Sequence, residues 1–325
     1  MTDPGLFLVD AILRQLDLEA TRVVKEPRGF MWWGGGLAQR VWADEPLRGS
    51  ELTLGRVHLR TDMLRGFKAR RDDLEELQLS MDDLALCGMV QGDDPARAQL
   101  QLTASLYCSE ADSEWQRRLA PFACSLQSGI AHRISGTLAL LVEAEPDLTA
   151  PATGEITCGD ETLLGIEETV VRPLGEGESA WQPAVLAQVA SIAIEKLLKS
   201  QVKNHDGVLT AALPFGESDE PALLVIEPTR RHPFLGAGVW SWLLLPSGAT
   251  PEPSMTMILA LNTAEQRSST GAHFLGSWTE HRSQLAYQVF LPNAIFAPGL
   301  LEPVVLSQAV RAQWAAAFLG AAFED

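Results

Sequence analysis

The chain has few of the residues that build disulfide-linked or metal-bound frameworks. It has 4 cysteines in 325 residues, and no two of them form a CxxC pair. Its 6 histidines are scattered, and none pairs with another at the spacing of metal ligands. We therefore expect buried thiols at Cys87, Cys108, Cys124 and Cys158, and neither a disulfide framework, a metal site nor a cofactor.

The chain is also short of positive charge and of long apolar runs. It has 25 basic residues against 42 acidic ones, which gives a net charge of −17. Such a surface repels phosphate backbones and anionic lipids, so we expect neither a nucleic-acid nor a membrane partner. No uncharged apolar run approaches the ~20 residues that a membrane span needs. Residues Met1–Gly5 lack the basic start and apolar stretch of a signal peptide, and we expect a cytoplasmic protein.

Common catalytic patterns are missing as well. The sequence contains no HExxH, GxSxG, GxxxxGK[ST], GxGxxG or EF-hand loop. An enzyme whose site is assembled from distant residues stays open, and its best acid–base candidates are His205 with Asp206 and Glu280 with His281. The alternatives are a turn for the first pair and a solvated strand edge for the second. We expect a protein that is not an enzyme, with a hydrolase-type enzyme as the alternative.

The run Gly34–Gly36 is the only glycine cluster that invites a ligand hypothesis. Successive glycines can present backbone N–H groups to an anion. Here the run lies between Trp33 and Leu37 and opens no recognisable helix. It is more typical of a turn or bulge between two pieces of strand.

What the sequence does contain indicates a folded protein of two domains. Hydrophobic residues make up 46% of the chain, and its length suits two cores. Pro146, Pro151 and Gly154 fall together with small polar residues and indicate a linker. We predict an N-terminal domain over residues 1–143, a linker over 144–160 and a C-terminal domain over 161–325.

The hydrophobic periodicity predicts an α+β fold in which each domain is an antiparallel sheet packed by N- and C-terminal helices. Asp3 as N-cap and Pro4 after it predict an opening helix. The switch of alternation at Gly55 predicts a β-bulge. Other expected helices are 72–86, one after Ser113 that Pro121 should kink, 181–202 and one after Pro303. The expected strands are 30–33, 37–43, 52–61, 99–108, 208–213, 222–227, 239–245, 255–261 and 285–291. Residues 137–142 are expected to form another strand or an apolar segment.

The two halves repeat this element order. Each runs helix, antiparallel strands, helix, and a short string strengthens the parallel. Gly29–Trp33 in the first half is similar to Gly238–Trp242 in the second. We therefore predict a tandem of two related domains.

Tryptophan is the most informative residue type, with 9 Trp against 2 Tyr. Consecutive Trp32 and Trp33 must point to opposite faces of a strand, whereas Trp240 and Trp242 share one face. Trp42 lies on the adjoining extended stretch. Aromatic side chains of this kind are enriched at protein-binding surfaces, and core packing between sheet and helices is the alternative.

Arg56, His58 and Arg60 occupy one face of a predicted strand. They could form a docking strip for an acidic segment, although such alternation also marks the solvated side of an antiparallel sheet. We take Trp32, Trp33, Trp42, Arg56, Arg60, Trp240 and Trp242 as candidate partner-binding residues.

The first domain resembles the YbjN and type III secretion chaperone (CesT-like) proteins, in a tandem-domain, actinobacterial-type form. The resemblance rests on Trp32-Trp33, Leu37–Ala43, Pro46, Gly55–Asp62, Ser105–Cys108, Trp115 and Phe122–Gln127. In the second half it rests on element order alone. Gly34–Gly36 departs from the bulkier connection expected of the family.

The resemblance implies a non-catalytic module that binds a polypeptide client at an aromatic-lined face or edge of its sheet. Because the family's members form dimers of one such domain, it also implies either a homodimer or a pseudo-dimer within one chain. A third hypothesis is a structural or regulatory subunit of a larger assembly. The sequence does not identify the client.

Overall fold

A computed structural model describes the chain in two compact units, except for a set of residues that it leaves undescribed. Unit 1 comprises Met1–Leu79 and Leu86–Arg172, and unit 2 comprises Ser80–Ala85 and Pro173–Asp325. Each unit is described separately below. The described residues are 3–50, 52–68, 77, 84–92, 94, 96–109, 113–150, 177–188, 196, 200–233, 235–297 and 299–323.

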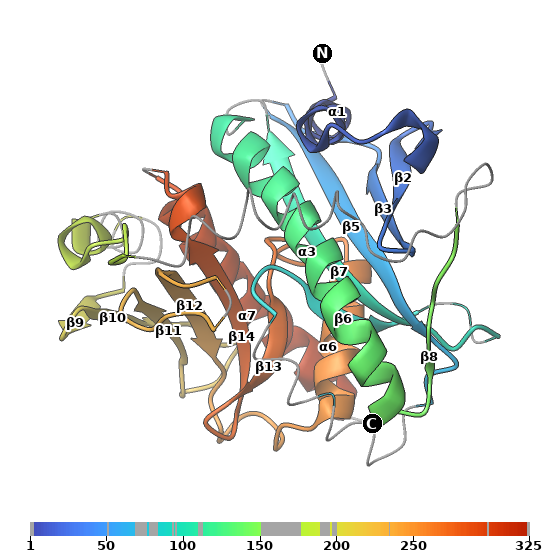
Figure 1. The fold of residues 1–325 in the computed structure, drawn as a ribbon. Helices are drawn as coiled ribbons and strands as arrows, with labels where there is room; N and C mark the ends of the chain where they lie inside the picture. The colour runs from blue at the N-terminus through green and yellow to red at the C-terminus, as the bar shows by residue number, and fades with distance from the viewer. Residues whose placement is uncertain are drawn as a thin grey trace. The chain divides into compact units, whose positions relative to one another are not determined.

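Unit 1 is built on an antiparallel sheet in the order β1-β2-β3-β5-β7-β6 (Figure 1). Two short strands, β4 and β8, pair with β5 beside this main path. The strands are β1 (Val23–Glu26), β2 (Gly29–Gly34), β3 (Leu37–Ala43), β4 (Leu47–Arg48), β5 (Thr53–Arg65), β6 (Gly88–Gln91), β7 (Leu100–Ser109) and β8 (Glu145–Pro146).

Two helices of unit 1 pack on the sheet. Helix α1 (Pro4–Leu16) starts as predicted, because the side chain of Asp3 accepts a hydrogen bond from the N–H of Leu6. Helix α3 (Ser113–Leu141) runs along β5 and β7 (Figure 1) and continues through Pro121. The strand predicted over 137–142 is wrong, because all but the last of these residues form the final turns of α3. A short 3-10 helix, η1 (Ala20–Arg22), precedes β1.

The glycine run closes a β-hairpin, as the turn interpretation predicts. Gly34 pairs with Leu37 across β2 and β3, and Gly35 and Gly36 between them have φ angles of 58° and 82°. Two successive positive φ angles are typical of the tight hairpin turns that favour glycine. A Cβ on Gly35 would also lie 2.2 Å from Nδ1 of His132 on α3.

The bulge predicted at Gly55 is wrong. Gly55 pairs in regular register with Cys108, and the register of β5 against β7 shifts further along, between Asp62 and Leu64. Gly55 is needed for a different reason: a Cβ there would lie 2.4 Å from the backbone nitrogen of Gly5. The start of α1 therefore rests directly on the sheet at a pair of glycines.

Unit 2 contains a second antiparallel sheet, in the order β13-β14-β12-β11-β10-β9 (Figure 1). Its described helical segments are residues 183–188, α6 (Met255–Arg267), the short η3 (Asn293–Ile295) and α7 (Leu301–Phe323). The strands are β9 (Val202–His205), β10 (Val208–Leu213), β11 (Ala222–Glu227), β12 (Gly238–Leu244), β13 (Ser277–His281) and β14 (Gln284–Pro292).

The strand predicted over 255–261 is helix α6 instead. A short apolar run fits a buried strand and a buried helix equally well, and local capping decides between them. Here Ser254 is the N-cap, with its side chain accepting from the N–H of Met257. The helix continues to Arg267, beyond the apolar run.

The two sheets have the same strand order. Four strands come first, a helix or helical residue follows, and the last two strands enter the sheet in reverse order before a closing helix. In unit 1 the intervening segment is described only at Leu77, which is helical and buried. The similar strings do not correspond, however, because Gly29–Trp33 lies in the second strand of its unit and Gly238–Trp242 in the fourth.

The predicted linker begins inside described structure. Glu145–Pro146 forms β8, and Leu148 bridges to Leu37, while residues 151–160 lie outside the described part. Among the described residues, no helix is long and apolar enough to cross a membrane.

Candidate functional site

The sheet of unit 1 has one face that its described helices cover. Side chains at Trp32, Gln39, Thr61 and their neighbours in register point towards α3, where the amide of Gln39 donates to the carbonyl of Cys124. Trp32 is 1% exposed and donates its indole N–H to Gln39 Oε1 at 2.7 Å. Trp32 is therefore a core residue and not part of a binding surface, because the alternation of β2 places it beneath α3.

The opposite face of this sheet has Trp42 at its centre. Trp42 is half-buried, and the imidazole of His58 stacks on it with ring centroids 4.8 Å apart. The guanidinium groups of Arg40 and Arg60 lie 5.2 Å and 5.6 Å from the centroid of the same indole. These are cation–π distances, so two guanidinium groups interact with the same indole ring. We call this face, which holds Arg40, Trp42, Arg56, His58 and Arg60, the Trp42 face.

Acidic side chains balance part of this charge. Arg40 forms an ion pair with Glu26 at 2.7 Å, and Arg56 and His58 both contact Oδ2 of Asp44. The hydrogen bond from His58, together with the charges of His58 and Arg56, holds the pKa of Asp44 well below its usual range against the opposing effect of burial. Asp44 is thus an anion that fixes the orientation of the side chains of Arg56 and His58.

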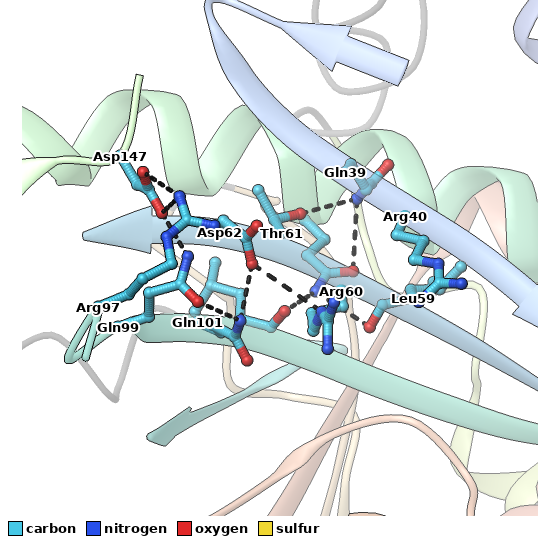
Figure 2. Close-up of polar contacts among 12 residues, drawn as sticks. Gln39, Arg40, Leu59, Arg60, Thr61, Asp62, Arg97, Gln99, Gln101 and Asp147 are labelled. Carbon is cyan, nitrogen blue, oxygen red and sulfur yellow. Dashed lines mark hydrogen bonds and ion pairs between the residues drawn. The ribbon is translucent and has the colours of Figure 1, made fainter. Parts of the chain in front are cut away.

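A row of polar side chains extends the Trp42 face along β5 and β7 (Figure 2). Asp147 is fully buried and accepts from Arg97 at 3.1 Å and from the amide of Gln99. The amide of Gln101 donates to Asp62 at 2.7 Å, and Arg60 lies 3.9 Å from the same carboxylate.

The pKa of Asp62, in the middle of this row, is raised above its ordinary value. Burial is the main cause, and the charge of Asp147 adds to it, whereas Arg60, Gln101 and Arg97 act in the opposite direction. Burying a partly compensated carboxylate costs free energy of folding, so such groups are candidates for functional sites. Asp147, with its hydrogen bonds, anchors the segment after α3 to the sheet.

Unit 2 has an aromatic cluster on the corresponding face. Trp240 and Trp242 stack at 5.1 Å, as their shared face predicts, and the guanidinium of Arg230 lies 5.7 Å and 5.5 Å from their ring centroids. His232 stacks on Trp240 and His281 on Trp242. Each of the two tryptophans is 2% exposed, so this cluster is buried where Trp42 is not.

The other predicted partner-binding residues fall mainly on the Trp42 face. Arg56 and Arg60 expose 21% and 29% of their side chains there. Trp33 points away from α3, opposite to Trp32 as predicted, and donates to the hydroxyl of Thr149 at 2.9 Å. Four of the seven predicted residues, Trp33, Trp42, Arg56 and Arg60, thus point to one face of the unit 1 sheet.

The two pairs of acid–base candidates lie at opposite edges of the unit 2 sheet. Nε2 of His205, the last residue of β9, lies 3.5 Å from Oδ2 of Asp206, and both side chains are more than 90% exposed. Glu280 and His281 lie on β13, at the opposite edge of the same sheet. The two pairs therefore cannot act on one substrate group. No group of three or more His, Cys, Asp or Glu side chains within the described ranges could hold a metal ion.

Several residues of these clusters were not predicted. Arg40 alternates with Trp42 on β3, so the period of two could have placed it beside Arg60. Asp62 follows Arg60 by two positions on β5, so the same period could have placed it on this face. Asp44, Asp147 and Arg230 gave no such signal, because their neighbours come from other strands and turns.

Comparisons of this chain with protein families, with curated proteins and with solved structures find no match.

Proposed function

We propose that this protein binds a polypeptide without catalysing a reaction, and that the client lies across the Trp42 face. The observation that carries the proposal is the half-buried indole of Trp42, which lies near Arg40 and Arg60 on the face of the sheet opposite to that packed by α3. Tryptophan and arginine are the residues most enriched at the energetic centres of protein interfaces.

The chemistry of this face supports a client with both apolar and carbonyl or carboxylate groups. Trp42 offers apolar surface, while the guanidinium groups of Arg40 and Arg60 are 39% and 29% exposed by side chain and can donate further hydrogen bonds. Glu26, Asp44 and Asp62 limit the net positive charge of the face. The net charge of −17 disfavours a strongly acidic client. An extended segment with an apolar side chain next to a single carboxylate fits best.

The same proposal places the chain with the YbjN and type III secretion chaperone proteins. It is supported by the motif block in the first 62 residues and by an antiparallel sheet with helices before and after it. We also propose a cytoplasmic location. Cys87, Cys108 and Cys124 are buried thiols, which are typical of proteins from reducing compartments.

The test is a screen of the full chain against displayed peptides, followed by affinity measurements on the best binders. We expect Trp42→Ala to weaken binding at least about tenfold, because it removes the centre of the interface. Trp115→Ala is the matched control, since Trp115 is also half-buried but lies on α3, on the other side of the sheet. Equal affinities for the Trp42→Ala and unmodified chains would contradict the proposal.

Arginine variants test the charge of the site. Arg60→Ala should weaken binding of carboxylate-bearing peptides, whereas Arg48→Ala, on the exposed strand β4, should not. A client that binds both variants equally well does not use the guanidinium of Arg60.

A further inference from the structure

Unit 2 contains a dipeptide that precedes the rest of this unit by more than 80 residues in the sequence. Leu84 and Ala85 belong to unit 2, although the residues on both sides, up to Leu79 and from Leu86, belong to unit 1. The N–H of Phe290 donates to the carbonyl of Ala85 at 3.0 Å, and the side-chain amide of Gln288 donates to the carbonyl of Leu84 at 3.1 Å. Both residues of the dipeptide are 0% exposed.

The place where the dipeptide binds is an incomplete edge of the sheet. Strand β13 pairs with β14 only from Gln284 to Gln288, whereas β12 pairs with β14 as far as Pro292. Beyond Gln288 the edge of β14 that faces away from β12 therefore has no strand partner from β13. A buried N–H without an acceptor costs free energy, and Ala85 supplies the acceptor for Phe290.

Two further buried donors on this part of the sheet have no acceptor among the residues that the structure describes. They are the hydroxyl of Ser277, which is opposite Gln288, and the indole N–H of Trp240, which is opposite Phe290. Ser277 is 0% exposed and Trp240 is 2% exposed. Both side chains lie on the face of the sheet to which those of Gln288 and Phe290 also point, because cross-strand partners share a face. Of the two, Ser277 adjoins the edge because it is the first residue of β13, whereas Trp240 lies on β12, on the other side of β14.

These features are those of a peptide-binding edge that reads backbone groups. The sheet supplies donors to two successive carbonyls, and Trp240 and His232 pack against the ring of Phe290 at centroid distances of 4.9 Å. The bound side chains, a leucine and an alanine, are apolar and small. Addition of an extended segment to a sheet edge is a common mode of peptide recognition.

We infer that the edge of β14 at Gln288–Phe290 is a peptide-acceptor site, that Leu84–Ala85 occupies it in cis, and that an extended apolar segment of a partner polypeptide binds there by displacing this dipeptide. The inference rests on the proposed polypeptide binding but assigns it a second site, in unit 2. Because a partner can bind only when the dipeptide has left the edge, its apparent affinity is the intrinsic affinity multiplied by the fraction of molecules in which the edge is free.

Hydrogen exchange of the unmodified chain tests whether the dipeptide leaves the edge. We expect the amide of Phe290 to exchange through local opening, faster than the amides of β12 and β14 that are bonded within the sheet. Exchange of Phe290 at the same rate as those amides would show that the dipeptide is a fixed part of the core, and would overturn the inference.

A labelled peptide tests the binding itself. The probe has the sequence of residues 80–87 with serine in place of Cys87, and its control carries Ala85→Asp. We expect the probe to bind the full chain and to bind a chain with Leu84→Ala about tenfold more tightly, because the smaller side chain weakens the cis dipeptide. Gln288→Ala in that chain should weaken the probe again. Absence of binding to both chains, or equal binding of probe and control, would overturn the inference.

The outcomes separate this site from the Trp42 face. Binding of the probe should be unchanged by Trp42→Ala, whereas binding of the screened peptides should be unchanged by Gln288→Ala. If the probe does not bind but the screened peptides do, the site on β14 fails and the Trp42 face stands; if only the probe binds, the reverse holds. Formation of a dimer by the Leu84→Ala chain, through exchange of Ser80–Ala85 between copies, would assign the edge to a second copy of this chain and overturn the partner proposal.

Discussion

The two units use the same strand order but fill the layer between sheet and closing helix with different chemistry. In unit 1 this layer holds a neutral network, in which Gln39 binds Trp32, Thr61 and the carbonyl of Cys124. In unit 2 it holds an ion pair, Glu265 with Arg311, at 2.8 Å and with side-chain exposures of 5% and 0%.

The charged network of unit 2 extends well beyond the ion pair. Arg311 also donates to Gln308, which in turn donates to Ser241 on β12. The guanidinium of Arg311 lies 3.4 Å from the centroid of the Tyr287 ring. Trp278 donates its indole N–H to Glu265 at 2.8 Å. The comparison teaches that topology does not fix the polar chemistry of the core. It also predicts that the two networks respond differently when one member is removed.

Removal of Glu265 should have the largest effect. Glu265→Ala leaves the buried guanidinium of Arg311 and the indole N–H of Trp278 without their acceptor, and a buried charge without its partner is costly. We expect a loss of about 3–5 kcal/mol in the free energy of unfolding, measured by urea denaturation with a probe of unit 2. The double variant Glu265→Leu with Arg311→Met should recover about half or more of this loss, because no charge then remains buried. A loss below about 1 kcal/mol for the single variant would show that the ion pair contributes little.

The neutral network of unit 1 should respond less. Gln39→Ala removes the acceptor of Trp32 and the donor to Thr61 and Cys124, but leaves no buried charge. We expect a loss of about 1–3 kcal/mol, measured by denaturation with a probe of unit 1. Gln91→Ala, at an exposed position of β6, is the matched control and should change little. A loss as large as that of Glu265→Ala would break the distinction between the two units.

The fold was largely predictable from the sequence because alternation and capping are local signals. Strand β11 begins and ends at the predicted residues, and α1 begins at its predicted N-cap. The misassigned segment 255–261 was a run of apolar residues without alternation, where the choice depended on Ser254 and on residues beyond the run. The role of Gly55 was predicted wrongly because the residue that leaves no room for a side chain there is Gly5, which lies 50 positions away in the sequence.

The candidate site was predictable only in part. Period-two spacing placed Trp240 beside Trp242 and opposed Trp32 to Trp33, and both arrangements are confirmed. Whether each indole is covered depends on α3 or on the packing of other strands, which no local pattern encodes. The role of Asp44 was missed for the same reason, because its partners Arg56 and His58 lie on the neighbouring strand β5.

The smallest expected effect concerns Asp44, on the Trp42 face of unit 1. Because the pKa of Asp44 is lowered in the folded state, its stabilising effect is fully present above the unfolded-state pKa of about 3.9 and is lost as the pH falls below it. Asp44 exposes 32% of its side chain, so we expect Asp44→Asn to cost only about 1 kcal/mol at pH 7. The difference from the unmodified chain should shrink in denaturation experiments at successively lower pH below about 4. Glu45→Gln, which alters a neighbouring acid with 83% of its side chain exposed, should show no such trend. If the Asp44→Asn difference stays constant down to pH of about 2.5, where the unfolded carboxyl is protonated, the carboxylate does not organise the Trp42 face through its charge.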